Sequence, residues 1–348
     1  MQTNTVLNKA YAKESALLET VFVCKMMYIV DMSLVDFLKQ IDEDVRNVLS
    51  DDFEIEITNT QFVPSFSDPF ITYDNLTERI KKCKLLKSCV LYIDIRNSAK
   101  ISVDNEADRL AKMYSAFVKN MISAARYYNG HIRNIIGDRI MVVFDRKDCF
   151  KNAFNTAILM NSISQHIIAK NITGIDFSCG IGIDFGEMLI VKTGAIRRGA
   201  ETEFYRGLVW LGRPANVASR LTDLANKSFS KIKHRVHKAS ADNPTSTSEW
   251  IWQEMSASKF LDQLEHKYPN KIVSVDPRHA NFFQTKYKKY WSYKPILMTA
   301  DFYRGLAKEC PDNKSIKNGW ITKNARTIPE YDDYLYEADV VFTNSQNL

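Results

Sequence analysis

The sequence predicts an α+β protein, because strand-like and helix-like patterns alternate along it. An apolar, β-branched run at 88–95 indicates a buried strand. Apolar residues then recur at helical spacing over 106–128. Two apolar runs, 131–136 and 139–144, flank Gly137-Asp138, which is typical of a hairpin. Hydrophobic residues make up 45% of the 348 residues and charged residues 25%, so the chain has the composition of a globular protein with a large core.

The same alternation continues through the rest of the chain. Apolar spacing predicts a second helix over 148–170, and a hairpin is expected at 176–193, turning at Phe185-Gly186. A short strand at 209–211 precedes a helix over 215–225, where Pro214 suits the first helical turn. A strand at 295–299 and a helix near 301–307 resume the pattern.

Three further segments differ from this pattern. Residues 1–86 form an N-terminal extension, helical over 9–49 and irregular after it, for which packing or dimer contacts are the expected roles. Residues 227–294 contain 13 Lys and Arg against 6 Asp and Glu, a net charge of +7 in a chain of +6, and we interpret them as an insertion. Within the insertion, 248–266 has a helical pattern. Residues 344–348 are a short tail.

The insertion has several interpretations. Its basic residues form either a solvated face or a rim that attracts anionic substrate. Clustered Lys, Trp and Tyr also allow nucleic-acid binding, but we do not expect nucleic acid as a partner.

Cysteine usage and hydropathy indicate a cytoplasmic protein that does not enter the membrane. The six cysteines are scattered without a C-x-x-C pair, which is typical of free thiols in a reducing compartment. The longest apolar stretch, 20–30, is too short to span a membrane and is interrupted by Lys25.

Two acidic residues on apolar strands suggest a divalent-metal site. Asp94 lies in the strand V-L-Y-I-D-I, and Asp138 lies between the two runs of the first hairpin. Each has an ordinary alternative, a polar strand end for Asp94 and a hairpin turn for Asp138. Neighbouring strands are about 4.8 Å apart, so two such carboxylates can share Mg²⁺ ions with phosphate oxygens.

Two other patterns favour a nucleotide. The polar turn Arg96-Asn97-Ser98 after the first strand offers backbone N–H groups to a phosphate. Asn216 and Arg220 are four residues apart and share one helix face, where an amide and a guanidinium suit a ribose and a phosphate.

In this order, the motifs Y-I-D-I-R-N-S, I-I-G-D, C-G-I-G-I-D-F-G-E and G-R-P-A-N-V-A-S-R-L resemble those of class III nucleotidyl cyclases. The likeness covers roughly 87–226 and, more loosely, 295–343. It implies a ferredoxin-like β-α-β-β-α-β core, an antiparallel sheet with flanking helices, within a catalytic domain at 87–343. It also implies a head-to-tail homodimer with active sites at the dimer interface.

The resemblance assigns roles to matching positions. Asp94 and Asp138, with the backbone carbonyl of Ile95, would bind two Mg²⁺ or Mn²⁺ ions per active site. Asn216 would orient the ribose, and Arg220 would stabilise the transition state, both from the opposite protomer. The 3′-oxygen would attack the α-phosphate, and pyrophosphate would leave.

Departures from the family pattern concern the base. The positions that read a purine in adenylate and guanylate cyclases hold Asn134 and Val209, and Asn97 replaces a glycine. The triphosphate-binding lysine has two candidates, Lys317 and Lys323.

Together with the extension and the insertion, these departures make the chain similar to bacterial Pycsar-type pyrimidine cyclases. That similarity implies a CTP or UTP substrate, and a cyclic product that acts in anti-phage defence through a downstream effector. The alternatives are a purine cyclase, or an inactive cyclase-fold module that binds nucleotides or partners.

Overall fold

The computed structural model describes residues 33–74, 78–194, 206–240, 251–268, 271–274 and 279–347. The chain divides into two compact units. One comprises 1–60, 64–85 and 189–211, and the other comprises 61–63, 86–188 and 212–348. Strands β2 (Ile80–Ile95) and β5 (Cys179–Gly194) contribute residues to both units.

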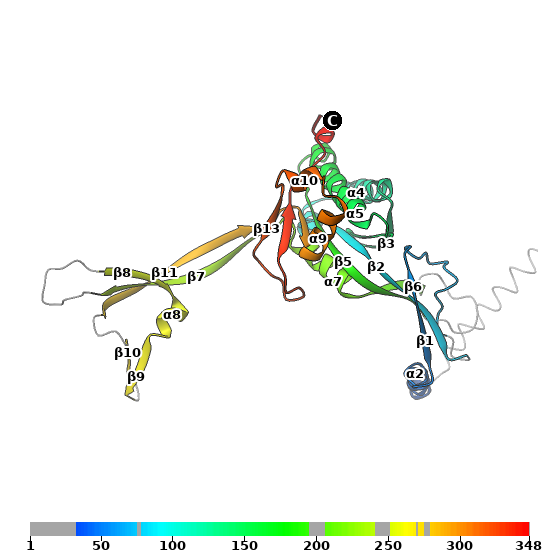
Figure 1. Ribbon diagram of the computed structural model, residues 1–348, viewed down its shortest axis with the longest axis horizontal. Coiled ribbons are helices and arrows are strands. Elements are labelled where there is room, and N and C mark those ends of the chain that lie inside the picture. The colour runs from blue at the N-terminus through cyan, green and yellow to red at the C-terminus, as the bar shows by residue number, and fades with distance from the viewer. Residues whose placement is uncertain are drawn as a thin grey trace, which may run out of the picture. The chain divides into compact units, whose positions relative to one another are not determined.

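The larger unit contains the predicted alternation of strands and helices, so the α+β class is confirmed. Its central strands lie in the order β5-β2-β4-β3, with β3 at Gly130–Ile136 and β4 at Arg139–Phe144. Helix α4 (Ala107–Tyr127) connects β2 to β3, and α5 (Cys149–Ser162) begins the connection from β4 to β5 (Figure 1). This is the order of a split β-α-β core.

Short elements complete these connections. A helix α3 (Ser98–Asp104) follows β2, and α5 continues through a π-helical turn η1 (Ile163–Ile168) into α6 (Ala169–Asn171). Large side chains that are fully buried, among them Phe117, Phe144 and Phe154, fill the core between the sheet and the helices. Burial of such side chains is the main stabilising contribution to the fold.

The sheet extends beyond β5 through later parts of the chain. Strand β12 (Ile296–Thr299) pairs with β5 in parallel, and antiparallel β14 (Leu335–Ala338) and β13 (Ile321–Asn324) follow. Helices α9 (Ala300–Glu309) and α10 (Lys314–Lys317) connect β12 to β13, and a 3₁₀ turn η3 (Thr343–Asn347) ends the described chain.

The predicted hairpin at 176–193 is wrong, because β5 runs without a turn through Phe185-Gly186. Its antiparallel partner beyond residue 188 is β6 (Arg206–Leu211). The glycines of β5 instead admit a neighbouring helix, α7 (Arg213–Leu224). A Cβ on Gly182 would lie 2.2 Å from the carbonyl oxygen of Ala218, so only glycine fits there.

In the smaller unit, β1 (Glu54–Thr60) pairs with β2, and β6 pairs with β5. Helix α2 (Leu34–Val48) begins at Ser33, whose hydroxyl accepts a hydrogen bond from the N–H of Asp36. The first part of the helix predicted over 9–49 lies outside the described residues.

The insertion is built mainly of strands. β7 (Ser228–Ser240) pairs along its length with β11 (His279–Ser292) and, near its end, with β8 (Ile251–Ser256) (Figure 1). A helix α8 (Ala257–Leu261) and a hairpin of β9 (Leu264–Tyr268) and β10 (Lys271–Ser274) follow β8. The helix predicted at 248–266 is therefore limited to α8 within the described residues.

No helix in the described part of the chain has the length and apolarity needed to cross a membrane. The five cysteines in that part are all free thiols, as predicted.

Candidate active site

The two acidic residues predicted to bind metal lie close together. Asp94 is the second-last residue of β2, and Asp138 lies in the turn between β3 and β4, preceded by Gly137 at a φ of 60°. Because β4 pairs with β2 through Ile93 and Ile140, the turn lies beside the end of β2. The two carboxyl groups are within hydrogen-bonding reach of each other.

The proximity of these groups has an electrostatic consequence. Burial, the hydrogen bond to Asp94 and the negative charge of Asp94 together raise the pKa of Asp138, and a hydrogen bond from Ser98 offsets part of this rise. Oδ2 of Asp138 is buried without a hydrogen-bond partner. Two adjacent carboxylates and an unpartnered oxygen favour a proton or a cation between them.

These residues fit a divalent cation. The described residues hold no group of three or more His, Cys, Asp or Glu side chains suited to a metal ion. Mg²⁺ is commonly held by one or two carboxylates together with substrate phosphates. The Asp94–Asp138 pair meets that requirement, with the buried end of β2 at Ile95 beside it.

Asp94 is also paired with two arginines. Nη2 of Arg139 donates to Oδ2 of Asp94 at 2.7 Å, and Nη2 of Arg96 lies 3.4 Å from the same oxygen. Arg139 donates to the carboxylate of Asp223 as well, and its Nη1 donates to Ser219 Oγ at 2.9 Å. Although burial lowers the pKa of Arg139, its hydrogen bonds to both carboxylates raise it, so the guanidinium stays charged.

Sequence reasoning missed Arg139, Ser219 and Asp223. The sequence did contain a signal for Arg139, which directly follows Asp138, the proposed metal-binding aspartate, in I-I-G-D-R. Ser219 and Asp223 follow Asn216 by three and seven residues and so share its helix face. Lys227 was assigned only to the insertion, but its charge interacts with those of Arg96, Asp223 and Asp94, and burial lowers its pKa.

The turn after β2 differs in part from the predicted phosphate cradle. The N–H of Arg96 donates to the carbonyl of Ser178, and its buried guanidinium donates to the carbonyls of Asp94, Asp223 and Ala225. We therefore correct its assignment from substrate binding to positioning of Asp94 and the end of α7.

Asn97 in the same turn explains a departure from the family motif. Its φ of 55° is in the left-handed region, which glycine and asparagine tolerate better than other residues. The side chain is exposed and makes no capping hydrogen bond at the start of α3.

The base-reading candidates are both exposed. Asn134 lies at an irregularity of β3, opposite Met141 of β4. Val209 belongs to the other compact unit, where it pairs with Val191 and is 37% exposed.

The two candidate lysines are occupied elsewhere. Nζ of Lys317 lies 2.6 Å from Asp312, and Nζ of Lys323 lies over the ring of Tyr334. No interaction among the described residues connects either lysine with Asp94 or Asp138.

Helix α7 presents Asn216 and Arg220 on its exposed face, while Val217 and Leu221 are buried. Nε of Arg220 lies 3.9 Å from Glu330, the one ion pair of Arg220 among the described residues. No hydrogen bond or ion pair in the described chain joins Asn216 or Arg220 to the two aspartates. Both side chains are exposed to solvent.

Comparison with known proteins confirms the resemblance to class III nucleotidyl cyclases, with pyrimidine cyclases among the relatives. The chain is 27% identical over 221 residues to a uridylate cyclase of Burkholderia cepacia, covering 59% of this chain and 91% of the relative. It is 23% identical over 238 residues to a uridylate cyclase of Gulbenkiania mobilis, covering 65% of this chain and 87% of that relative. No family profile matches the chain.

The chain is also similar to a cytidylate cyclase over a shorter stretch, and to a solved cyclase structure. A cytidylate cyclase of Staphylococcus aureus is 30% identical over 109 residues, covering 28% of this chain and 25% of the relative. The adenylyl cyclase CyaB from P. aeruginosa is 17% identical with a TM-score of 0.43, covering 74% of this chain and 95% of that structure.

Proposed function

We propose that the protein is a nucleotidyl cyclase that converts CTP or UTP into the 3′,5′-cyclic monophosphate and pyrophosphate. The observation that carries the proposal is the adjacency of Asp94 and Asp138, with the unpartnered Oδ2 of Asp138. The relatives named uridylate and cytidylate cyclases support the reaction type and the pyrimidine base.

In this proposal, Asp94, Asp138 and the carbonyl of Ile95 hold two Mg²⁺ or Mn²⁺ ions in each active site. When bound, such ions lower the pKa of the attacking hydroxyl and neutralise phosphate charge. Arg139 and Arg96 orient Asp94, because both guanidinium groups contact its carboxylate. Lys227 joins the site as a further cation for the triphosphate, a role that Lys317 and Lys323 fill less well.

Asn216 and Arg220 act in this proposal on the site of a second protomer. Asn216 holds the ribose so that the 3′-oxygen faces the α-phosphate, and Arg220 donates to phosphate oxygens as their charge grows. Asn134 has an amide that donates and accepts, which suits either pyrimidine edge. Val209 stays a candidate for contact with the base.

The proposal is tested by mass spectrometry of products after separate incubation with ATP, GTP, CTP and UTP in the presence of Mn²⁺. We expect a cyclic pyrimidine monophosphate from one nucleotide, lost in Asp138→Ala and retained in Asp108→Ala, which removes an exposed acid on α4. Cyclic AMP or cyclic GMP as the sole product would refute the pyrimidine base. No product from any nucleotide would refute the cyclase.

We also infer a role in anti-phage defence, in which the cyclic product acts on a downstream effector. Bacteria that express the protein should survive phage infection better than bacteria that express Asp138→Ala. Equal survival of the two strains would contradict the role.

A further inference from the structure

The two long strands of the insertion are basic and contain no acidic residue. Residues 228–240 and 279–292 carry seven Lys and Arg and no Asp or Glu. These strands, β7 and β11, pair with each other from Ser228–Ser292 onward. We refer to this pair as the basic ribbon.

The register gathers the charges on one face of the ribbon. Lys231, Lys233 and Arg235 alternate along β7 and therefore point to the same side. Lys289 lies directly opposite Lys231, and Tyr287 lies directly opposite Lys233. Directly opposite residues share a face, so these four cations and one aromatic ring form a single surface.

The three lysines of this surface have no acidic partner. Lys231, Lys233 and Lys289 are exposed, and no ion pair in the described chain involves them. Like charges directly opposite each other destabilise a sheet. An anion bound between Lys231 and Lys289 would therefore relieve their repulsion and stabilise the folded ribbon.

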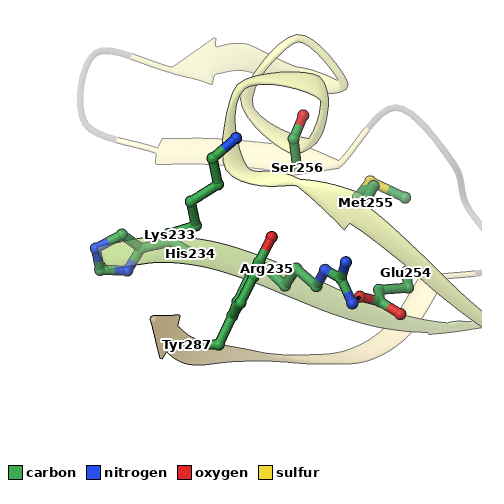
Figure 2. Close-up of a pocket in the computed structure, with 7 residues that line it drawn as sticks. All are labelled: Lys233, His234, Arg235, Glu254, Met255, Ser256 and Tyr287. Atoms are coloured by element: carbon green, nitrogen blue, oxygen red, sulfur yellow. Dashed lines mark ion pairs between the residues drawn. The ribbon is translucent and has the colours of Figure 1, made fainter. Parts of the chain in front are cut away.

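A hollow beside these residues adds room for a ligand. It measures about 450 Å³ and is lined by Lys233, Arg235 and Tyr287 of the ribbon, together with Glu254 and Ser256 of β8. Figure 2 shows Lys233 and Tyr287 extending to the same side of the ribbon. The guanidinium of Arg235 lies 4.7 Å from the ring centre of Tyr287 and pairs with Glu254.

We infer that this face of the basic ribbon binds single-stranded nucleic acid. Lysines two residues apart on a strand are separated by about 7 Å and can follow a phosphate backbone. The Tyr287 ring offers a surface on which a base stacks, an interaction that tolerates any sequence. Binding that combines a basic groove with aromatic rings is typical of proteins for single-stranded nucleic acid.

From composition alone, nucleic acid was not expected as a partner of the insertion. Composition gives the number of charges, but the strand register places four of them on one face around an aromatic ring. An acidic protein or an anionic membrane would bind the lysines and would not need the Tyr287 ring. The hollow next to Tyr287 favours a base.

The test measures fluorescence anisotropy of labelled oligo(dT) and oligo(U) with the purified full chain. We expect tight binding that weakens as salt rises, because phosphate contacts release counterions. Lys231→Gln/Lys233→Gln/Lys289→Gln should weaken binding at least about tenfold. The variant should unfold at no lower temperature than the wild type, because it removes the like-charge pair.

The matched control is Lys112→Gln/Lys147→Gln/Lys170→Gln, which removes three exposed lysines outside the insertion. It changes the net charge by the same amount and should leave binding within about twofold. Tyr287→Ala should weaken binding to the single strands and not to a duplex. A control that weakens binding as much as the ribbon variant would overturn the inference.

Two further outcomes would also overturn it. One is a duplex that binds as tightly as the single strands. The other is binding only to phosphatidylglycerol vesicles, and not to either oligonucleotide. Because none of these readouts depends on nucleotide cyclisation, the inference stands or fails separately from the proposed function.

Discussion

The guanidinium of Arg139 contacts Asp94, the same carboxylate that is proposed to bind a divalent cation. Its guanidinium donates to Asp94 and to Asp223, and Asp94 is 15% exposed. In Arg139→Ala both carboxylates lose a charged partner, so the free energy of unfolding should fall by about 2 kcal/mol. The loss is measured by urea unfolding.

The same variant tests the metal site. Without the positive charge of Arg139, a cation binds Asp94 and Asp138 more favourably. Mn²⁺ should therefore raise the melting temperature of Arg139→Ala more than that of the wild type. Arg126→Ala, which removes an exposed arginine of α4, is the control and should behave as the wild type. A response to Mn²⁺ no larger than that of the wild type would contradict competition between Arg139 and the cation.

Asp184 gives the protein a predicted pH dependence of stability. Its side chain is fully buried in β5, and although Thr299 donates to it at 2.5 Å and Arg213 lies 3.7 Å away, burial raises its pKa to about 6. In the unfolded chain the group has an ordinary pKa, so the folded state binds the proton more tightly. Stability from this group is present at acidic pH and is lost as pH rises to about 6.

The isosteric variant Asp184→Asn removes that titration. Between about pH 4 and pH 7.5 the wild type should lose about 2 kcal/mol more unfolding free energy than the variant. Urea unfolding at the two pH values measures the difference. Asp312→Asn, which changes an exposed acid, should follow the wild type. Parallel curves for the wild type and Asp184→Asn would show that the buried carboxyl does not titrate in this range.

At the scale of elements, the sequence predicted the central strands and helices well, because their apolar spacing is regular. It failed at β5, where Phe185-Gly186 resembled a turn. Gly186 instead allows the close approach of Pro214, whose Cγ would lie 2.7 Å from an added Cβ. A local pattern cannot distinguish a glycine that turns the chain from one that admits a neighbouring helix.

The candidate site, like the fold, was predicted from the sequence only in part. The Asp94 and Asp138 pair could be proposed because each acid interrupts an apolar run. The buried position of Arg96 could not, since its partners are carbonyls at the end of α7, more than a hundred residues away. Contacts of this kind depend on tertiary packing and leave no local signal.

The packing of α7 against β5 gives a prediction for that element. In Gly182→Ala, the new Cβ would lie 2.2 Å from Ala218 O and 2.4 Å from Thr222 N, both backbone atoms of α7. The helix must move, so the free energy of unfolding should fall by about 3 kcal/mol. Urea unfolding measures the loss. Gly207→Ala, where nothing lies within 4 Å, should change it little. Equal stability of both variants would contradict the tight packing.

At the scale of the whole molecule, no hydrogen bond or ion pair among the described residues joins the two aspartates to Asn216 or Arg220, the two parts of the proposed chemistry. The aspartates are paired at the end of β2, while Asn216 and Arg220 are exposed on α7. A head-to-tail dimer would complete two sites, because each chain would supply its α7 face to the aspartates of the other.

Mixing two inactive variants tests this arrangement. Asp94→Ala and Arg220→Ala should each be inactive as homodimers, the first without a metal-binding carboxylate and the second without the transition-state arginine. In a mixed dimer one site contains both defects, and the other contains intact residues from both chains. Product formation from the mixture should therefore recover toward about half of the wild-type rate per mixed dimer. A mixture that stays inactive, with mixed dimers demonstrated by mass spectrometry of differently tagged chains, would place all the catalytic residues of each site in one chain.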